Sequence, residues 1–299
     1  MNAFEQQRLI LGCMRLNKLS QKEADRYLNH VIDKGITYFD HSDVYADGEC
    51  ERIFGRFLKN NPGVRDKIII QDKTCIISGK MYDASYEHIM SAVDKQLKDL
   101  ATDHMDVLLL HRPDALLEPE EVNRAFNELK KSGKVLNFGV SNFYSGQIEL
   151  IQRELDEKLK FNQIQFGPAK AELVTDSMMT NMIQKNGSNR YSETLDYCRL
   201  NEMRMQSWSP LQWGNIEGCF FNNPDYKELC AKLTEIGDKY GVDKAAIAVA
   251  FNLRHPANMQ VILGTMNEKH FDQMIEALNI KLSRDEWYQI MLSAGYPLP

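Results

Sequence analysis

The chain has 299 residues, of which 43% are hydrophobic and 26% are charged, and its formal net charge is -6. This composition indicates a folded chain with one large domain or two ordinary ones, and it excludes a disordered protein. Lysine and arginine are scattered along the sequence, so we expect neither a nucleic-acid partner nor an anionic membrane surface.

Targeting and redox features point to a protein of the cytoplasm. The longest apolar runs, 107–110 and 245–251, are too short to span a bilayer. The N-terminal segment lacks the basic start and apolar core of a secretory signal. The six cysteines are widely spaced without a C-x-x-C pair, which predicts neither a metal site nor a disulfide scaffold. We therefore expect reduced thiols.

Strand-like apolar runs alternate with amphipathic helices along the chain. Several of these runs are continuously apolar, which is typical of parallel strands covered by helices. The predicted strands are residues 9–14, 36–40, 67–73, 105–111, 136–142, 161–167, 204–210 and 259–265. The predicted helices are 20–34, 49–59, 85–100, 119–132, 145–155, 192–200, 225–240 and 267–278, with extra helices at 243–254 and 283–294.

Eight strands alternating with eight helices predict an α/β fold, a single (β/α)8 TIM barrel that takes in residues 1–299. The alternative is a doubly wound open sheet, whose fingerprint G-x-G-x-x-G does not follow the first strand. About 25 residues, 168–192, separate the sixth strand from its helix. This length predicts a long loop that is a functional lid or a disordered excursion. Its methionines could line an apolar pocket or pack against the barrel.

In a barrel of this kind the active site is built at the carboxyl ends of the strands. Each side chain there also has a structural interpretation, as a helix cap, a surface ion pair or a core histidine. Four titratable groups gathered at one end, however, would be costly to bury without a purpose. The residues at the successive strand ends are Asp40 with Tyr45 just beyond it, Lys73, His111, Ser141 and Asn142, Gln163, Trp208, and Gly264 and Thr265.

A family resemblance emerges from the order of these segments. ITYFDHSDVY, IIIQDK, DLATDHMDVLLLHRPD, GKVLNFGVSNF, FNQIQ, WSPL and VILGT together resemble the signature segments of the aldo-keto reductases. The resemblance covers about residues 8–295. It implies a barrel that binds a nicotinamide dinucleotide without a Rossmann domain and transfers a hydride to an aldehyde or ketone.

By this resemblance Tyr45, Lys73, Asp40 and His111 form a catalytic tetrad. Tyr45 would deliver a proton to the carbonyl oxygen, for which a free phenol with a pKa of about 10 is a reluctant donor. A nearby Lys73 ammonium, held by Asp40, would lower that pKa. His111 would orient the substrate carbonyl through a hydrogen bond.

The resemblance also assigns contacts to the nicotinamide end of the cofactor. Ser141, Asn142 and Gln163 would hydrogen-bond the carboxamide, which needs both donors and acceptors. Trp208 stands where the family more often places a tyrosine, and its indole would stack on the nicotinamide ring.

The phosphate groups are assigned to two further segments. Ser209 and Leu211 belong to the loop expected at the pyrophosphate. Gly264 and Thr265 lead to a helix start near residue 267, where backbone N–H groups favour a phosphate. His270 replaces the usual arginine at the 2′-phosphate position, and an imidazole binds phosphate less firmly than a guanidinium. The expected cofactor is NADPH, with NADH as the alternative.

Other functions remain open at this point. Lys73 at a strand end could form a Schiff base in an aldolase-like lyase. The barrel could also be a nucleotide-binding sensor or accessory subunit in which turnover is incidental. We expect a small-molecule carbonyl substrate, no metal and a monomer. Arg15 and Arg112 could attract an anionic substrate or could form structural ion pairs.

Overall fold

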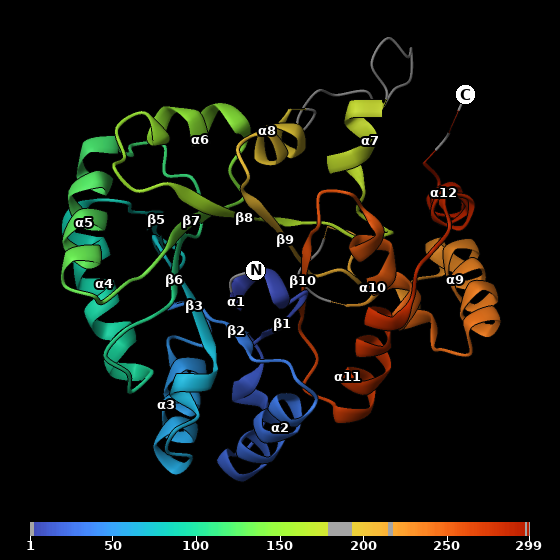
Figure 1. Cartoon of the computed structure of the whole chain (residues 1–299), viewed down its shortest axis with the longest axis horizontal. Helices are drawn as coiled ribbons and strands as arrows, with labels where there is room; N and C mark the ends of the chain where they lie inside the picture. Colours follow the sequence, from blue (N-terminus) through green and yellow to red (C-terminus); the bar gives the residue numbers. More distant parts are fainter. Residues whose placement is uncertain (1–2, 179–192, 215–217, 297, 299) are drawn as a thin grey trace. The chain divides into compact units, whose positions relative to one another are not determined.

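The computed structural model describes residues 3–178, 193–214, 218–296 and 298 (Figure 1). Eight strands form a closed barrel in the order β1-β10-β9-β8-β7-β6-β3-β2. This confirms the predicted (β/α)8 architecture, and each strand lies within two residues of its predicted bounds. The barrel strands are β1 (Leu9–Gly12), β2 (Tyr38–Asp40), β3 (Ile69–Thr74), β6 (Val107–Leu110), β7 (Phe138–Ser141), β8 (Leu159–Gln165), β9 (Arg204–Trp208) and β10 (Gln260–Leu263).

The helices also follow the predicted order. The first long helix begins with the expected capping box, in which Ser20 and Glu23 each accept a backbone N–H of the other. The helices are α1 (Ala3–Gln6), α2 (Gln21–Asp33), α3 (Glu49–Asn60), α4 (Tyr86–Asp99), α5 (Pro119–Lys131), α6 (Ser145–Gln152), α7 (Glu172–Met178), α8 (Thr194–Leu200), α9 (Lys227–Tyr240), α10 (Lys244–Arg254), α11 (Glu268–Ile275) and α12 (Arg284–Ser293).

Helix α1, one hairpin and helix α7 were not predicted from the sequence. A short antiparallel hairpin, β4 (Ile76–Ile77) with β5 (Met81–Tyr82), follows β3 outside the barrel. Helix α7 lies within the predicted long loop, and the rest of that loop, 179–192, lies outside the described residues. All three are too short to give a periodic pattern that can be recognised in the sequence.

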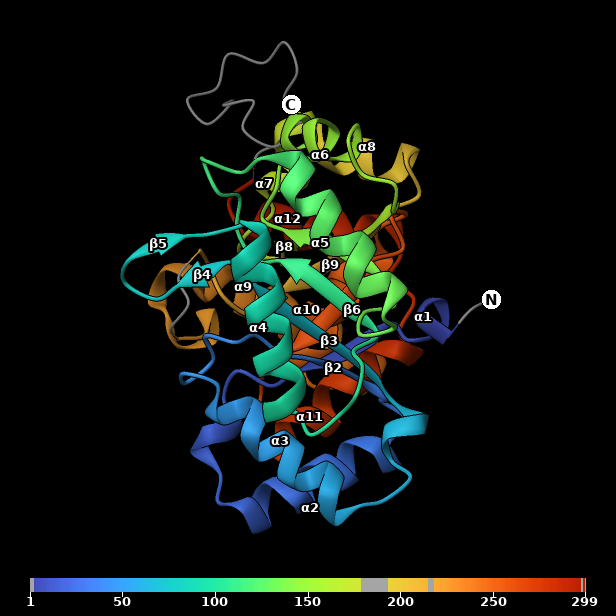
Figure 2. The ribbon, with the colours of Figure 1, turned by 90° about the vertical axis from the view of Figure 1, so that its left-hand side faces the viewer.

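The chain divides into two compact units, 1–162 with 264–266 and 163–263 with 267–299. In the first unit, α2, α3, α4 and α5 lie outside the strands β1, β2, β3, β6 and β7 (Figure 2). The second unit contains β9 and β10, which pair in parallel, together with α7 to α12. A single domain spanning 1–299 remains a prediction.

Strand register in the first unit brings chemically active side chains to one end. Asp40 pairs with Gln71, and Lys73 pairs with Leu109 on the neighbouring strand. All residues of β2, β3 and β6 are buried. Because parallel strands end at the same edge, the residues that close β2 and β3 and the residue that follows β6 are neighbours.

The cysteines, the helices and the possible metal ligands bear on further expectations from the sequence. All six cysteines have free thiols, as expected. Among the residues with a described structure, no helix has the length and apolarity to cross a membrane, and no group of three or more histidine, cysteine, aspartate or glutamate residues could hold a metal ion.

Gly55 sets the close approach of α3 to the end of α4. A Cβ atom at Gly55 would lie 2.2 Å from the carbonyl oxygen of Asp99 and 2.9 Å from the carbonyl carbon of Leu100. Replacing glycine by alanine in an exposed helix normally stabilises a protein by roughly 1 kcal/mol. At Gly55 we expect the opposite, because backbone atoms cannot rotate away, with a loss of about 1–3 kcal/mol for Gly55→Ala.

Urea unfolding of this variant checks the expectation. Gly146→Ala in α6 is the matched control, since the new Cβ would meet only the exposed ring of Tyr144, at 3.1 Å. The packing argument is wrong if Gly55→Ala unfolds at the same or a higher urea concentration than the unmodified chain.

Candidate active site

A buried ion pair lies where β2 and β3 end. The Nζ atom of Lys73 donates to Oδ2 of Asp40 at 2.6 Å, and the two side chains are 0% and 3% exposed. Nε2 of Gln71 donates to the other carboxylate oxygen at 2.7 Å, and the Tyr38 hydroxyl donates to Gln71 at 2.8 Å. A buried charge is tolerated only when it is paired and hydrogen-bonded in this way. Asp40 therefore holds the Lys73 ammonium in one position.

Tyr45 reaches the same lysine from the turn after β2. The Nζ atom of Lys73 lies 5.1 Å from the centroid of the half-buried Tyr45 ring. The next three residues, Ala46, Asp47 and Gly48, have left-handed backbone with φ of 51, 52 and 80°. For the two residues that are not glycine this conformation costs about 1–3 kcal/mol each, and such strain is concentrated at functional sites. The strained turn supports a functional role for the tyrosine that precedes it.

Burial and neighbouring charges shift the pKa values of Lys73 and Tyr45 in opposite directions. Burial lowers the pKa of Lys73, but the Asp40 carboxylate and the Tyr45 phenol more than offset it, so the pKa is raised and the amine stays charged. Burial raises the pKa of Tyr45 to about 12, although Lys73 lowers it. Lys73 thus lowers the pKa of Tyr45 as expected, but burial outweighs this effect, so the net pKa is raised. At neutral pH Tyr45 is a protonated phenol, as a proton donor must be.

His111 follows β6 and faces Tyr45. The ring centroids lie 6.2 Å apart at 87°, and Nδ1 of His111 is 3.0 Å from Oγ of Ser42. Burial, followed by the charges of Lys73 and Arg112, lowers the pKa of His111 well below its ordinary value, so the imidazole is neutral. The Ser42 hydroxyl can also donate to the carbonyl oxygen of Lys73 or to Asp43, each at 3.3 Å. In the tautomer in which it donates to Nδ1, the proton of His111 lies on Nε2, which can donate to a carbonyl oxygen. Ser42 was not singled out from the sequence, although it lies two residues beyond Asp40.

Ser141 and Asn142 lie at the end of β7, beside this cluster. Nδ2 of Asn142 donates to Oγ of Ser141 at 2.9 Å and to the carbonyl oxygen of His111 at 3.2 Å. The backbone of Asn142 is left-handed, with φ of 63°, a conformation that asparagine tolerates better than most residues. The hydroxyl and the amide are therefore fixed to the strand end that carries His111.

Gly264 and Thr265 belong to the same unit, and their carbonyl oxygens already accept hydrogen bonds. Nη1 of Arg15 donates to Gly264 at 3.2 Å, and the Tyr27 hydroxyl donates to Thr265 at 2.6 Å. Arg15 thus has a structural contact. Arg112 is half-buried and makes no hydrogen bond or ion pair with any residue in the described part of the chain, so a role in attracting an anionic substrate stays a prediction for Arg112.

The predicted residues of the second unit begin with Gln163 and Trp208. Gln163 lies in β8 and is 2% exposed; its Nε2 donates to Gln206 at 3.2 Å, and Gln206 in turn donates to Gln260 at 3.0 Å. This amide chain fixes the side chain of Gln163. Trp208 is half-buried at the end of β9.

The remaining predicted contacts lie in turns of the second unit. Ser209 has left-handed backbone with φ of 49°, which is strained for a residue other than glycine. The carbonyl oxygen of Leu211 accepts from the backbone N–H of Phe220 at 3.0 Å. Asn267 caps α11 by accepting from the backbone N–H of His270 at 3.1 Å, and the His270 side chain is exposed. A helix start near residue 267 is therefore confirmed.

The structure thus joins six of the predicted residues into one cluster of the first unit and places five others in the second unit. The cluster contains Asp40, Tyr45, Lys73, His111, Ser141 and Asn142. The residues of the second unit are Gln163, Trp208, Ser209, Leu211 and His270.

Two buried carboxyl groups next to Lys73 were not predicted. Glu51 of α3 and Asp72 of β3 are both 0% exposed, and each influences the pKa of the other. Oδ1 of Asp72 accepts from the backbone N–H of Lys73 at 2.8 Å. Both oxygens of Glu51 and Oδ2 of Asp72 receive no hydrogen bond from a donor in the described residues. Two adjacent buried carboxylates cannot both be ionised, so we expect a proton on one of them, which would donate to the other.

This pair predicts a loss of stability as the pH rises. Burial is the largest influence that raises the pKa of Glu51 to about 7, from an ordinary value of 4.5, and burial followed by the charge of Glu51 raises that of Asp72. Between pH 4.5 and about 7 the folded chain binds more protons than the unfolded chain. The free energy of unfolding therefore falls as the pH rises through this range, by on the order of 3 kcal/mol. Glu51→Gln cannot ionise and its amide can donate to Asp72, so we expect a smaller fall.

Urea unfolding at pH 5, 6, 7 and 8 measures this slope. The exposed substitution Glu87→Gln, also on a helix of the first unit, is the control and should keep the slope of the unmodified chain. Equal slopes for Glu51→Gln and the unmodified chain would show that the two carboxyl groups do not share a proton.

Comparison with known proteins places this site in a family. The sequence profile of the Aldo/keto reductase family matches residues 8–292. An uncharacterised oxidoreductase of Bacillus subtilis, YcsN, is 33% identical over 306 residues, which cover 98% of this chain and 96% of that protein. A 6-dehydroglucose reductase of Agrobacterium fabrum is 34% identical over 303 residues, covering 96% and 94%. The chain therefore belongs to the aldo/keto reductase family, whose members are oxidoreductases that use NAD(P)H.

A solved structure agrees on the fold. An aldo/keto reductase of Klebsiella pneumoniae, crystallised with NADP and acetate, superimposes with a TM-score of 0.76 at 23% identity, covering 98% of this chain and 92% of that one. At 23% identity this similarity shows that the two proteins share the barrel fold, and nothing more.

Proposed function

We propose that this protein reduces an aldehyde or a ketone to an alcohol with NADPH, and that Tyr45 donates the proton. The observation that carries the proposal is the buried Lys73–Asp40 pair at 2.6 Å with the Tyr45 ring beside the ammonium. A buried cation next to a protonated phenol stabilises the phenolate that remains after proton donation. The neutral ring of His111 lies 6.2 Å from the ring of Tyr45.

The residues present suit a nicotinamide dinucleotide. The hydroxyl of Ser141 and the amide of Asn142 adjoin at the end of β7, and they offer the donors and acceptors that a carboxamide needs. Gln163 would hold the same group and Trp208 would stack on the ring. Ser209, Leu211, Gly264, Thr265 and His270 are the proposed contacts of the phosphate groups. NADPH, when bound, supplies the hydride that reduces a carbonyl carbon.

The chain's own part in the reaction is to orient a carbonyl and to supply a proton. Nε2–H of His111 donates a hydrogen bond to the carbonyl oxygen. The phenol of Tyr45 gives its proton to that oxygen as negative charge develops there, and Lys73 stabilises the resulting phenolate. The raised pKa of Lys73 keeps its amine charged, which suits this role and not that of a Schiff-base nucleophile, which must be neutral.

The named relatives support the choice of substrate class and cofactor. One relative at 34% identity is a 6-dehydroglucose reductase, and the Klebsiella protein was crystallised with NADP. We further propose that the chain acts as a monomeric single-barrel enzyme of the cytoplasm, a setting in which its six free thiols persist.

Titration with each cofactor, followed by a panel of carbonyl compounds, tests the proposal. We expect NADPH to bind more tightly than NADH, and NADPH oxidation to depend on an added aldehyde or ketone; the panel includes 6-dehydroglucose. Tight cofactor binding without oxidation for any panel member, together with a stable protein partner, would instead support an accessory role.

A further inference from the structure

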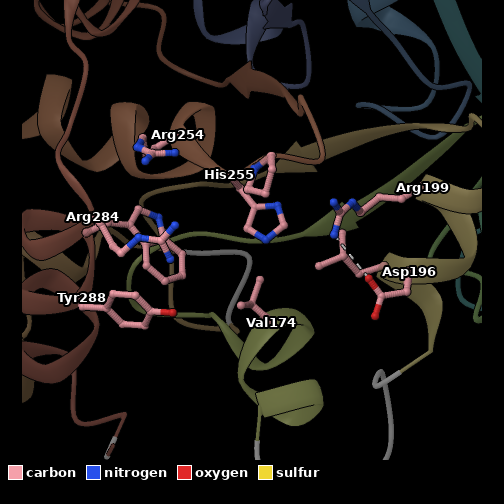
Figure 3. A pocket seen from close by; sticks show the side chains of 10 residues that line it. Val174, Asp196, Arg199, Arg254, His255, Arg284 and Tyr288 are labelled. Carbon is pink, nitrogen blue, oxygen red and sulfur yellow. Dashed lines mark hydrogen bonds and ion pairs between the residues drawn. The ribbon is translucent and has the colours of Figure 1, made fainter.

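A cationic pocket in the second unit takes no part in the proposed reaction. It has a volume of about 360 Å³ and lies among α7, α8, the end of α10 and α12. Figure 3 shows Arg284 and Tyr288 entering it from α12, Arg199 and Asp196 from α8, and His255 between them. None of the pocket's lining residues belongs to the tetrad or to the proposed cofactor contacts.

The pocket carries an excess of positive charge. Among the described residues that line it, Arg199, Arg254 and Arg284 face one carboxylate, Asp196, so their formal charge is 3 - 1 = +2 in a chain whose net charge is -6. Arg199 and Asp196 are 3.5 Å apart and largely exposed, so this ion pair neutralises little of the charge. Nε of Arg254 donates to the carbonyl oxygen of Leu282 at 2.7 Å, which leaves the end of its guanidinium fork toward the pocket.

Several donors in the pocket have no acceptor among the residues that the structure describes. Arg284 and the Tyr288 hydroxyl make no hydrogen bond or ion pair within the part of the chain that the structure describes. Nδ1 of His255 accepts from the backbone N–H of Ala257 at 3.1 Å, and burial lowers the pKa of His255 to about 4. The neutral ring therefore carries its proton on Nε2 and offers a further donor. Donors without acceptors favour an anion and disfavour a cation.

One wall of the pocket is apolar and rigid. Trp287 is 7% exposed, stacks on Phe251 with ring centroids 4.8 Å apart, and donates its N–H to the Phe251 carbonyl oxygen. Leu195 and Val174 are buried beside the pocket. Such a wall suits the organic part of a ligand whose charged group meets the arginines.

We propose that this pocket binds a phosphate monoester, with the phosphate dianion on the guanidinium groups and a short apolar group against Trp287. Guanidinium forks match phosphate oxygens in bidentate geometry. A phosphate monoester carries nearly two negative charges at neutral pH, which balances the formal charge of the pocket.

Calorimetric titration with phenyl phosphate tests the proposal, in a buffer free of phosphate and with saturating NADP⁺ to fill any phosphate site of the cofactor. We expect one binding site. Arg284→Gln and Arg199→Gln should each weaken binding by about tenfold or more, because each removes a charge-assisted contact. Phenyl sulfate, with a single charge, should bind more weakly, and so should inorganic phosphate, which lacks the ring.

Arg153→Gln is the control, because Arg153 is exposed at the end of α6 in the other unit. The affinity of Arg153→Gln for phenyl phosphate should equal that of the unmodified chain. The proposal is overturned if no phenyl phosphate binds in the presence of NADP⁺, if both arginine variants bind it as well as the unmodified chain does, or if phenyl sulfate binds equally well. The titration reads binding and not turnover, so its outcome is independent of the reductase proposal.

Discussion

Tyr45→Phe is expected to lower the turnover of aldehyde reduction by about 10²–10⁴-fold, the usual contribution of a positioned general acid. The substitution removes the only atom of Tyr45 that can donate a proton and keeps the ring that lies 6.2 Å from His111. Because burial raises the pKa of Tyr45 to about 12, the phenol stays protonated from pH 6 to 9. The unmodified chain should therefore show no loss of activity from phenol ionisation in that range.

The measurement is steady-state NADPH oxidation, with cofactor binding followed separately through quenching of tryptophan fluorescence. Cofactor affinity should be unchanged, since no proposed cofactor contact is altered. Tyr82→Phe, at a tyrosine that is 48% exposed in β5, serves as the matched control and should keep full activity. Wild-type turnover in Tyr45→Phe would mean that another group delivers the proton.

Lys73→Met is expected to lower both activity and stability. It leaves the buried Asp40 carboxylate with Gln71 as a neutral donor in place of an ammonium. Removing one partner of a buried ion pair typically costs 3–5 kcal/mol because an uncompensated charge remains, so we expect a loss of about that size in urea unfolding. Turnover of the folded protein should fall by about 10²-fold or more, because the phenolate form of Tyr45 loses its stabilising charge.

A double variant separates folding from chemistry. Asp40→Asn combined with Lys73→Met removes both charges, and the asparagine carbonyl oxygen can still accept from Gln71. We expect most of the lost stability to return while activity stays absent, which is the non-additive result of two residues in direct contact. Recovery of activity together with stability would show that Lys73 acts only through the fold.

Much of the barrel is predictable from the sequence because the strands are buried runs. Residues 107–110 read as a continuous apolar segment, and the structure places them in β6 with every side chain buried. The hairpin of β4 and β5 was missed because strands of two residues carry no measurable periodicity. Helix α7, with seven residues, fell inside an expected loop for the same reason.

Most residues of the candidate site can be predicted from the sequence, but their pKa values cannot. Asp40, Lys73 and His111 are recognisable because each stands at the end of an apolar run. The net pKa of Tyr45 was not predictable, because it depends on how deeply the phenol is buried and not only on which charge is near it. Glu51 was missed because nothing in the pattern of α3 distinguishes a buried glutamate from a solvent-facing one.

Transfer of isotope from cofactor to product tests the central claim most directly. The unmodified chain is incubated with NADPH deuterated at the transferring position of the nicotinamide and with an aldehyde that the panel identifies. We expect one deuterium on the alcohol carbon of the product for each NADPH oxidised, and almost none formed by Tyr45→Phe in the same time. A product without deuterium, or a carbonyl compound trapped on Lys73 by borohydride, would contradict a hydride-transferring reductase.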